Sequence, residues 1–203
     1  VETVVADLAD RADVTRVAAL LDDPARRTDV FVNNAGFGVH TPLLAEDPSP
    51  HERGIAVMVT AVLILGGAAA RGMRRRGHGA IVNVSSTAGF VTMGSYSAIK
   101  AWVTSYTEGL ANELHGSGVT ATALCPGWVR TEFHERADID TRRIPNAMWL
   151  RAEPLVDACL HDVAAGRVIS IPSTRYRILI ALARHAPRGA IRAISRGISS
   201  SRG

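Results

Sequence analysis

The stretch "GAIVNVSSTAGFVTMGSYSAIKAW", residues 79–102, joins a run of apolar and β-branched residues to a helical pattern. The run ends in two serines, Ser85 and Ser86, and the helical part carries Tyr96 and, four residues later, Lys100. Side chains four residues apart on a helix lie on one face, with Cβ atoms about 5–6 Å apart. The stretch therefore predicts a strand, a hydroxyl pair at the strand end, and a helix that brings an ammonium beside a phenol.

The same alternation of strand and helix patterns extends over most of the chain. Runs rich in β-branched residues predict strands over residues 1–8, 28–36, 79–86, 119–127 and 167–173. Apolar residues at helical spacing predict helices over residues 13–23, 52–74, 95–115 and 153–166. Strands that alternate with helices of this length indicate right-handed crossovers and an α/β fold, with a parallel sheet covered on both faces.

The composition favours one globular domain. With 203 residues, 47% of them hydrophobic, the chain has enough apolar surface for one well-buried core. Its two cysteines, Cys125 and Cys159, form no close pair and no metal-ligand cluster, which favours a reduced, cytoplasmic compartment and no metal site. The net charge of +4 comes mostly from arginines without interleaved aromatic residues, so we do not expect a nucleic-acid partner.

Polar or glycine-containing segments stand where four of the predicted strands end. They are Asp7, "NNAG" at residues 33–36, the Ser85–Ser86 pair, and "PG" at residues 126–127. Binding residues of open parallel sheets lie at the carboxyl ends of the strands. One crevice can therefore collect all four segments.

The ordered set "DL", "NNAG", "NVSS", "YSAIK" and "PGWVRT" resembles the short-chain dehydrogenase/reductase family, over residues 1 to about 172. The resemblance implies a Rossmann-like, doubly wound parallel sheet. It also implies an enzyme that transfers a hydride between NAD or NADP and a small-molecule ketone, aldehyde or secondary alcohol. Residues 173–203 lie beyond the last family strand and are expected to form a basic amphipathic C-terminal extension.

The resemblance gives three residues catalytic roles. Tyr96 gives or takes the proton, Lys100 lowers the pKa of the phenol from about 10, and Ser86 polarises the substrate carbonyl. Ser85 is the adjacent alternative, but neighbouring strand residues face opposite ways, and we favour Ser86. A purely structural interpretation stays open, with Tyr96 half-buried, Lys100 solvated and both serines in a turn.

The resemblance also implies a set of cofactor-binding residues: Asp7, Asn33, Ala35, Gly36, Tyr96, Lys100, Pro126, Gly127, Val129 and Thr131. Asp7 matches an acid near the adenine, although it can instead cap the strand end. We expect Gly36 to adopt a φ that larger residues resist. Thr131 matches the position whose hydroxyl holds the carboxamide or a phosphate.

The segment over residues 132–152 corresponds to the variable substrate lid. Trp149 and Leu150 are candidates for a hydrophobic substrate pocket, and Trp128 either shapes the substrate side or packs in the core. His134 has no recognisable metal spacing and is interpreted as a solvated lid residue.

Two departures from the family pattern bear on activity. The glycine-rich TGxxxGxG turn that receives the cofactor pyrophosphate at a helix N-terminus is absent from the 203 residues. Residues 1–8 match the third family strand, so we expect an N-terminally truncated domain without the first two β-α units, about 50 to 60 residues, and the choice of NAD or NADP is unreadable. Met58 stands where the family usually has an asparagine. A catalytically inactive fragment that acts only as an oligomer or interaction partner is therefore the alternative function.

Two segments predict contacts with partners. The uncharged run over residues 54–70 is slightly short of the roughly 20 residues that cross a bilayer, and we expect a buried helix that forms a homodimer or homotetramer interface. The C-terminal extension suggests an amphipathic helix broken at Pro187. Such a helix can weakly contact an anionic membrane surface or an oligomer partner, or pack on its own domain.

Overall fold

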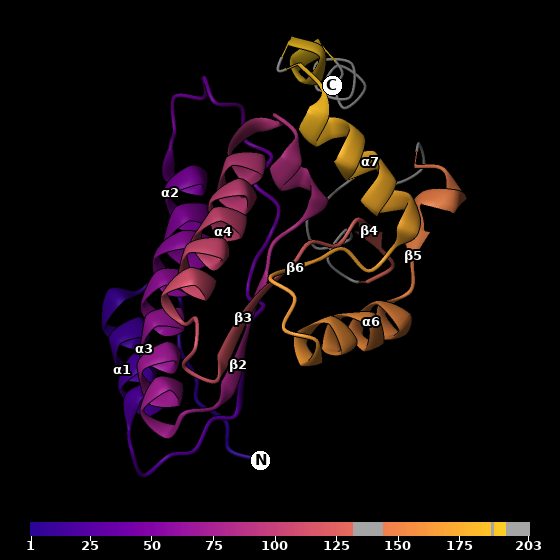
Figure 1. The fold of residues 1–203 in the computed structure, drawn as a ribbon. Coiled ribbons are helices and arrows are strands. Elements are labelled where there is room, and N and C mark those ends of the chain that lie inside the picture. Colours follow the sequence, from indigo (N-terminus) through magenta and orange to yellow (C-terminus); the bar gives the residue numbers. More distant parts are fainter. Residues whose placement is uncertain (132–143, 188, 194–203) are drawn as a thin grey trace.

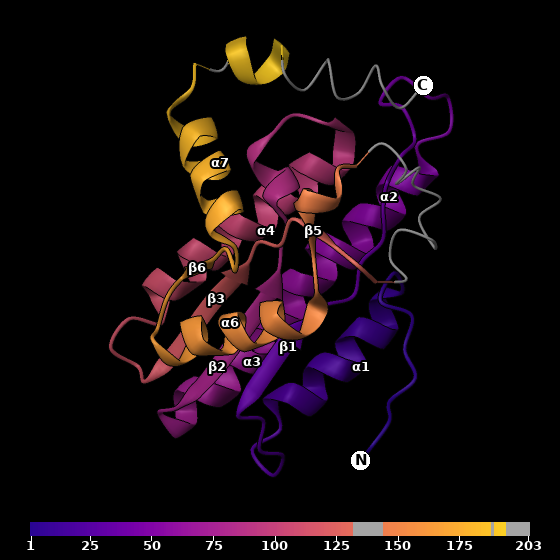
Figure 2. The same ribbon diagram turned by 90° about the vertical axis from the view of Figure 1, so that its right-hand side faces the viewer.

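The computed structural model describes residues 1–131, 144–187 and 189–193. Its centre is a parallel sheet of β1 (Val30–Asn33), β2 (Gly79–Val84), β3 (Val119–Leu124) and β6 (Ile169–Ser170). The strands lie side by side in the order β1-β2-β3-β6; Figure 1 labels β2, β3 and β6, and Figure 2 labels all four. Each crossover between neighbours contains a helix, so the predicted parallel α/β sheet is confirmed.

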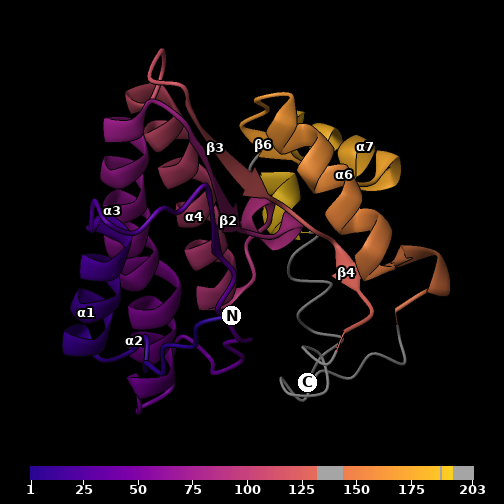
Figure 3. The ribbon, with the colours of Figure 1, turned by 90° about the horizontal axis from the view of Figure 1, so that it is seen from below.

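Helices cover both faces of this sheet (Figure 3). On one face lie α1 (Arg11–Asp22), α3 (Ala61–Arg76) and α4 (Gly94–Glu113), and on the other lies α6 (Ala152–Ala164). In the classic Rossmann strand order, 3-2-1-4-5-6, only the strands of the second half follow one another in chain order, as the strands of this sheet do. The doubly wound Rossmann-like class is thus confirmed, and the sheet consists of the strands on one side of the usual centre.

The long apolar helix expected over residues 52–74 is confirmed and extended. It begins as α2 (Ser49–Ile55), passes through a π-helical segment, η1 (Ala56–Thr60), and continues as α3. Gly77, at φ 76°, ends it in the left-handed conformation that favours glycine. Its length and hydropathy would allow a membrane span, but it packs against both α1 and the sheet and is interpreted as a core helix.

The predicted strand over residues 1–8 is wrong. No strand occurs before Val30 in the described residues, and the side chains of Val1, Val4 and Val5 are exposed. A strand exists through hydrogen bonds to a neighbour, and these residues have no neighbouring strand on which to pair. The first regular element is instead α1, whose N-cap residue Asp10 accepts a hydrogen bond from the backbone N–H of Asp13.

Two apolar layers hold the sheet between its helices. On the α3–α4 side, Met73, Ile81 and Leu110 belong to one buried cluster. On the α6 side, Val82 and Leu155 belong to another. Because β2 contributes to both clusters, its carboxyl end is a fixed platform for the residues that follow it.

The described structure also contains a second small sheet, with its strands labelled in Figure 1, and helical segments near the C-terminus. Strand β4 (Trp128–Val129) pairs in parallel with β5 (Trp149–Leu150). Helix α7 (Thr174–His185) ends just before Pro187, so the predicted break at that proline is confirmed. α7 packs against the short 3-10 helix η2 (Thr87–Phe90), which directly follows Ser86.

Candidate active site

The carboxyl end of β2 and the first turns of α4 bring the predicted triad together. The Lys100 ammonium lies 5.6 Å from the centroid of the Tyr96 ring. The Ser86 side chain lies near the Tyr96 hydroxyl, where hydrogen bonding to it acts to lower the pKa of the phenol. The sequence spacing alone placed Tyr96 and Lys100 on one helical face, and the packing of α4 on β2 and η2 adds the serine.

The two serines of the pair have different environments. The Ser85 side chain is buried, and its Oγ donates to the carbonyl oxygen of Lys100 at 2.7 Å and lies 2.8 Å from Thr104 Oγ1. Ser86 Oγ accepts from the Ala88 backbone N–H at 3.1 Å and caps η2 while still reaching Tyr96. Ser85 therefore ties β2 to α4, and Ser86 is the serine that faces the phenol.

Lys100 is the only lysine among the 23 basic residues of the chain, the others being arginine. Its side chain is buried, and its Nζ donates to the carbonyl oxygen of Val84 at 2.9 Å. Burial lowers the pKa of Lys100 from 10.5 to about 8. An arginine at this position would stay charged at every accessible pH, whereas a lysine can hold or release a proton near neutrality.

The expectation that Lys100 lowers the pKa of Tyr96 is wrong for this structure. Burial raises the pKa of Tyr96 to about 12, and the hydrogen bond with Ser86 only partly opposes that effect. The physical reason is that desolvation penalises the phenolate, while the ammonium is directed to the Val84 carbonyl. Tyr96 is consequently a protonated donor near pH 7.

The "NNAG" turn lies against the same lysine. Gly36 does not have a positive φ, so the conformational reason expected for this glycine is wrong. Its role is steric: a Cβ on Gly36 would lie 3.1 Å from Met58 Sδ and 3.7 Å from Lys100 Nζ. Met58 itself is 1% exposed and belongs to a buried cluster against which Tyr96 packs. The bare glycine therefore leaves space beside the ammonium, and Met58 fills the core behind it.

The side chains of Asn33 and Asp7 both form hydrogen bonds with other residues of the chain. The Asn33 amide donates to Asn83 Oδ1 at 2.8 Å, and the Asn83 amide donates to Thr107 Oγ1 at 3.0 Å, which links β1, β2 and α4.

The Asp7 carboxylate accepts from the Ala9 backbone N–H at 2.9 Å and lies 3.4 Å from an Arg53 nitrogen. Asp7 thus forms a turn before α1, and it does not cap a strand end, because no strand precedes it in the described residues.

The "PGWVRT" segment follows β3 at the same edge of the sheet. Pro126 accepts hydrogen bonds from Thr87 through its carbonyl oxygen, and Val129 packs in the cluster on the α6 side. A Cβ on Gly127 would lie 1.9 Å from Tyr176 Cζ, so only glycine allows this tyrosine to pack there. Ala35 and Thr131 are exposed near the ends of their segments.

The aromatic residues proposed for the substrate side pack together. The rings of Trp128 and Trp149 have centroids 6.0 Å apart and are tilted by 57°. Leu150 pairs with Val129 in the small sheet, which places β5, near the end of the predicted lid segment, beside the segment after β3. His134 lies outside the described residues.

Sequence reasoning missed three contributors to the site. Thr104 stands one helical turn after Lys100 and completes the Ser85 network, a spacing the sequence displays. Tyr176, assigned to the extension, accepts from the Trp128 backbone N–H at 3.0 Å and donates to the Met148 carbonyl at 2.8 Å. The π segment over residues 56–60 has no evident sequence signal, although such segments are frequent at functional sites.

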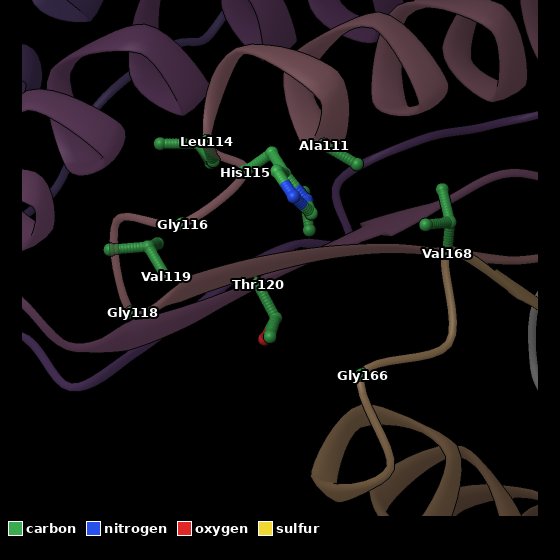
Figure 4. A pocket seen from close by; sticks show the side chains of 10 residues that line it. Ala111, Leu114, His115, Gly116, Gly118, Val119, Thr120, Gly166 and Val168 are labelled. Atoms are coloured by element: carbon green, nitrogen blue, oxygen red, sulfur yellow. The ribbon is translucent and has the colours of Figure 1, made fainter.

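Two surface hollows lie at the opposite edge of the sheet. One is lined by residues from the C-terminal end of α4, the start of β3 and the turn after α6, with His115 at its side (Figure 4). The other is lined by Arg71, Arg74 and Arg75 at the end of α3. Both are at the amino-terminal ends of strands, away from the triad. Within the described ranges, no group of three His, Cys, Asp or Glu side chains could hold a metal ion.

Comparison with known proteins identifies the family. The model of the short chain dehydrogenase family matches residues 1–141, so the chain belongs to this family. It is 41% identical over 145 residues to a ketoacyl reductase assigned to the monensin polyketide synthase of Streptomyces virginiae, covering 66% of this chain and 54% of that protein. It is 30% identical over 168 residues to gluconate 5-dehydrogenase of Gluconobacter oxydans, covering 78% and 66%.

A solved structure gives the same result for the fold. The short-chain dehydrogenase from Sphingobium yanoikuyae in complex with NADPH superposes with a TM-score of 0.77 and 32% sequence identity. The match covers 88% of this chain and 72% of that one. The chain spans between 54% and 66% of the length of the two curated relatives named above.

Proposed function

We propose that this chain forms the catalytic half of an NAD(P)-dependent oxidoreductase that interconverts a ketone or aldehyde with an alcohol. The observation that carries the proposal is the convergence of Ser86, Tyr96 and Lys100 at the carboxyl end of β2. The relatives named above are a reductase and dehydrogenases, and one structural neighbour holds NADPH, which supports the same chemistry.

The residues define roles in the reduction direction. Ser86 donates a hydrogen bond to the substrate carbonyl oxygen, and Tyr96 transfers its hydroxyl proton to that oxygen as the carbonyl carbon accepts a hydride. Lys100, whose pKa burial lowers to about 8, supports the reprotonation of the phenolate that is left. A bound NADH or NADPH would supply the hydride. General acid catalysis of this kind contributes about 10²–10⁴-fold in rate.

The described residues fit one end of such a cofactor. The bare Gly36 leaves room beside Lys100, and the segment over residues 126–131 lies on the same sheet edge, so these residues would hold the nicotinamide and its ribose. The 203 residues contain no TGxxxGxG turn that would bind the charged pyrophosphate of the cofactor. The proposal therefore assigns these residues to positioning and proton transfer, and leaves the choice of NAD or NADP open.

The alternative is a non-catalytic partner protein. It is favoured by β1, whose outward-facing Val30 and Val32 side chains are about half exposed on an open sheet edge. The two functions differ in one measurable property, since only the oxidoreductase requires the Tyr96 hydroxyl.

The test uses the chain extended ahead of Val1 by the N-terminal β-α-β-α units of the Sphingobium yanoikuyae relative. Tyr96→Phe in that chain should lower carbonyl reduction by at least about a hundredfold, because the proton donor is lost while the ring is kept. Cofactor binding should be retained. Tyr106→Phe is the matched control, since Tyr106 also lies on α4 but donates to the Leu63 carbonyl. Near-normal turnover of the Tyr96 variant would refute the assignment.

We further propose that the protein is cytoplasmic and forms a homodimer or homotetramer through the helix over residues 54–70. Ile55 and Leu63 are about half exposed on this helix, an apolar surface that a second copy would cover. Light scattering at micromolar concentration should show an oligomer. A monomer at that concentration would contradict this part of the proposal.

A further inference from the structure

Helix α7 has an inner face that is fixed to the domain. Tyr176 and Ile180 are 5% and 6% exposed, and the Tyr176 hydroxyl bonds the backbones of Trp128 and Met148. The Arg184 guanidinium lies 5.7 Å from the centroid of the Phe90 ring in η2. α7 is therefore held in one orientation relative to the sheet, and its remaining surface faces outward.

The outward surface of α7 is apolar. Ile178, Leu179 and Leu182 are 57%, 45% and 66% exposed, and we call these three residues the outer stripe. Ile178 and Leu182 are four residues apart and lie on one face, roughly opposite Tyr176 and Ile180. A helix whose inner face already packs on its domain normally presents polar residues to water. The outer stripe therefore indicates a surface that is covered by something else.

The charge around the outer stripe is strongly positive. Arg175 and Arg177 are exposed on the same helix. In sequence, residues 173–203 contain seven arginines and no acidic residue, whereas residues 1–172 contain 16 basic and 19 acidic residues. The cationic excess of the whole chain thus belongs to its C-terminal segment, and an anionic surface is its electrostatic complement.

We propose that α7 docks on an anionic phospholipid membrane, with the outer stripe entering the headgroup region and its arginines facing the lipid phosphates. Basic helices with an aliphatic face bind in this way, lying in the plane of the interface. A second copy fits less well, because pairing two outer stripes would also bring like charges together. Nucleic acid would match the arginines but would leave the aliphatic side chains uncovered. This inference is independent of the chemistry proposed above.

Vesicle sedimentation of the 203-residue chain tests the proposal. We expect the protein to sediment with vesicles of phosphatidylcholine and phosphatidylserine in a ratio of about 2:1, and not with phosphatidylcholine alone. Ile178→Gln with Leu182→Gln should weaken partitioning by at least about tenfold. Arg175→Gln with Arg177→Gln should weaken it by about twenty-fivefold, about fivefold for each charge lost.

The matched control lies on α6. Val156→Gln with Leu160→Gln changes two aliphatic side chains at the same four-residue spacing, 48% and 53% exposed, and should leave vesicle binding unchanged. The side chains changed in both double variants are exposed, namely Ile178 and Leu182 on α7 and Val156 and Leu160 on α6. The melting temperatures of both variants should therefore stay close to that of the parent chain. Absence of binding to anionic vesicles, equal binding to neutral ones, or undiminished binding of the Ile178 and Leu182 variant would overturn the proposal. Conversion of an oligomer to a monomer by that variant, without vesicle binding, would assign the outer stripe to a second copy instead.

Discussion

Neighbouring strands β1 and β2 differ sharply in how they are supported. Val32 and Val82 are register partners of the same residue type, yet Val32 is 50% exposed and Val82 is 4% exposed. β2 has a strand on each side and apolar clusters on both faces, whereas β1 is an edge strand that lacks a cover on the face of Val30 and Val32. The β2–α4–β3 half is thus a complete layered core, and the β1 half is not.

This difference explains where the site forms. The Ser85–Thr104 and Asn83–Thr107 hydrogen bonds join β2 to α4 inside the completed half, and they fix the backbone from which Lys100 projects. Residues 1–8 have a comparable β-rich composition but no neighbour, and they form no strand. A strand sequence becomes a strand when a partner supplies its hydrogen bonds.

The largest expected effect concerns cofactor affinity. Residues 1–203 should bind NADH or NADPH no better than about millimolar, because the missing pyrophosphate contacts are worth roughly a factor of a thousand. The same chain extended ahead of Val1 by two β-α units should reach about micromolar affinity. Titration calorimetry of both proteins measures this. Micromolar binding by the shorter protein would show that the β1 half is functionally complete.

The second-largest expected effect distinguishes the catalytic role of Ser86 from the structural role of Ser85. In the extended chain, Ser86→Ala should lower the rate of carbonyl reduction by about a hundredfold, since one donor to a developing oxyanion is lost. Ser85→Ala should change the rate by less than about tenfold but destabilise the fold by about 1–3 kcal/mol, because Thr104 and the Lys100 carbonyl lose a buried partner. Steady-state rates and denaturant unfolding distinguish these outcomes. The reverse pattern would transfer the catalytic role to Ser85.

The third prediction tests the strand comparison directly with one substitution at two partner positions. Val82→Ala should lower the free energy of unfolding by about 2 kcal/mol, through lost burial and a residual cavity. Val32→Ala should lower it by less than about 0.5 kcal/mol, as for an exposed surface position. Equal losses in urea unfolding would mean that β1 is covered in solution, for example by a second copy.

The smallest effect is a pH dependence from Lys100. Because burial lowers its folded-state pKa to about 8, the unfolded chain binds more protons above that pH, and stability must rise with pH there. We expect a gain of about 1 kcal/mol between about pH 7 and about pH 9 that is absent in Lys100→Met. Since the chain has one lysine, ¹³C-lysine labelling gives a single titrating Cε resonance. A midpoint near the ordinary value of about 10.4 would contradict the burial of this ammonium.

The sequence by itself determined the alternation of elements, the strand-end position of Ser86 and the i, i+4 placement of Tyr96 and Lys100. These features depend on local periodicity, which is visible along the chain. The family assignment followed from the same ordered motifs and is confirmed by the match over residues 1–141.

Only the tertiary structure decided the remaining properties. Residues 1–8 are not a strand because pairing depends on a neighbour that local sequence does not specify. Position 36 favours glycine because a Cβ there would crowd Met58, not because the backbone has a special φ. Burial raises the pKa of Tyr96 although an ammonium lies nearby. Tyr176, far along the chain, packs on Gly127 in the segment after β3. Each of these depends on which side chains meet after folding and how much water they exclude, and neither quantity is a property of the sequence around one residue.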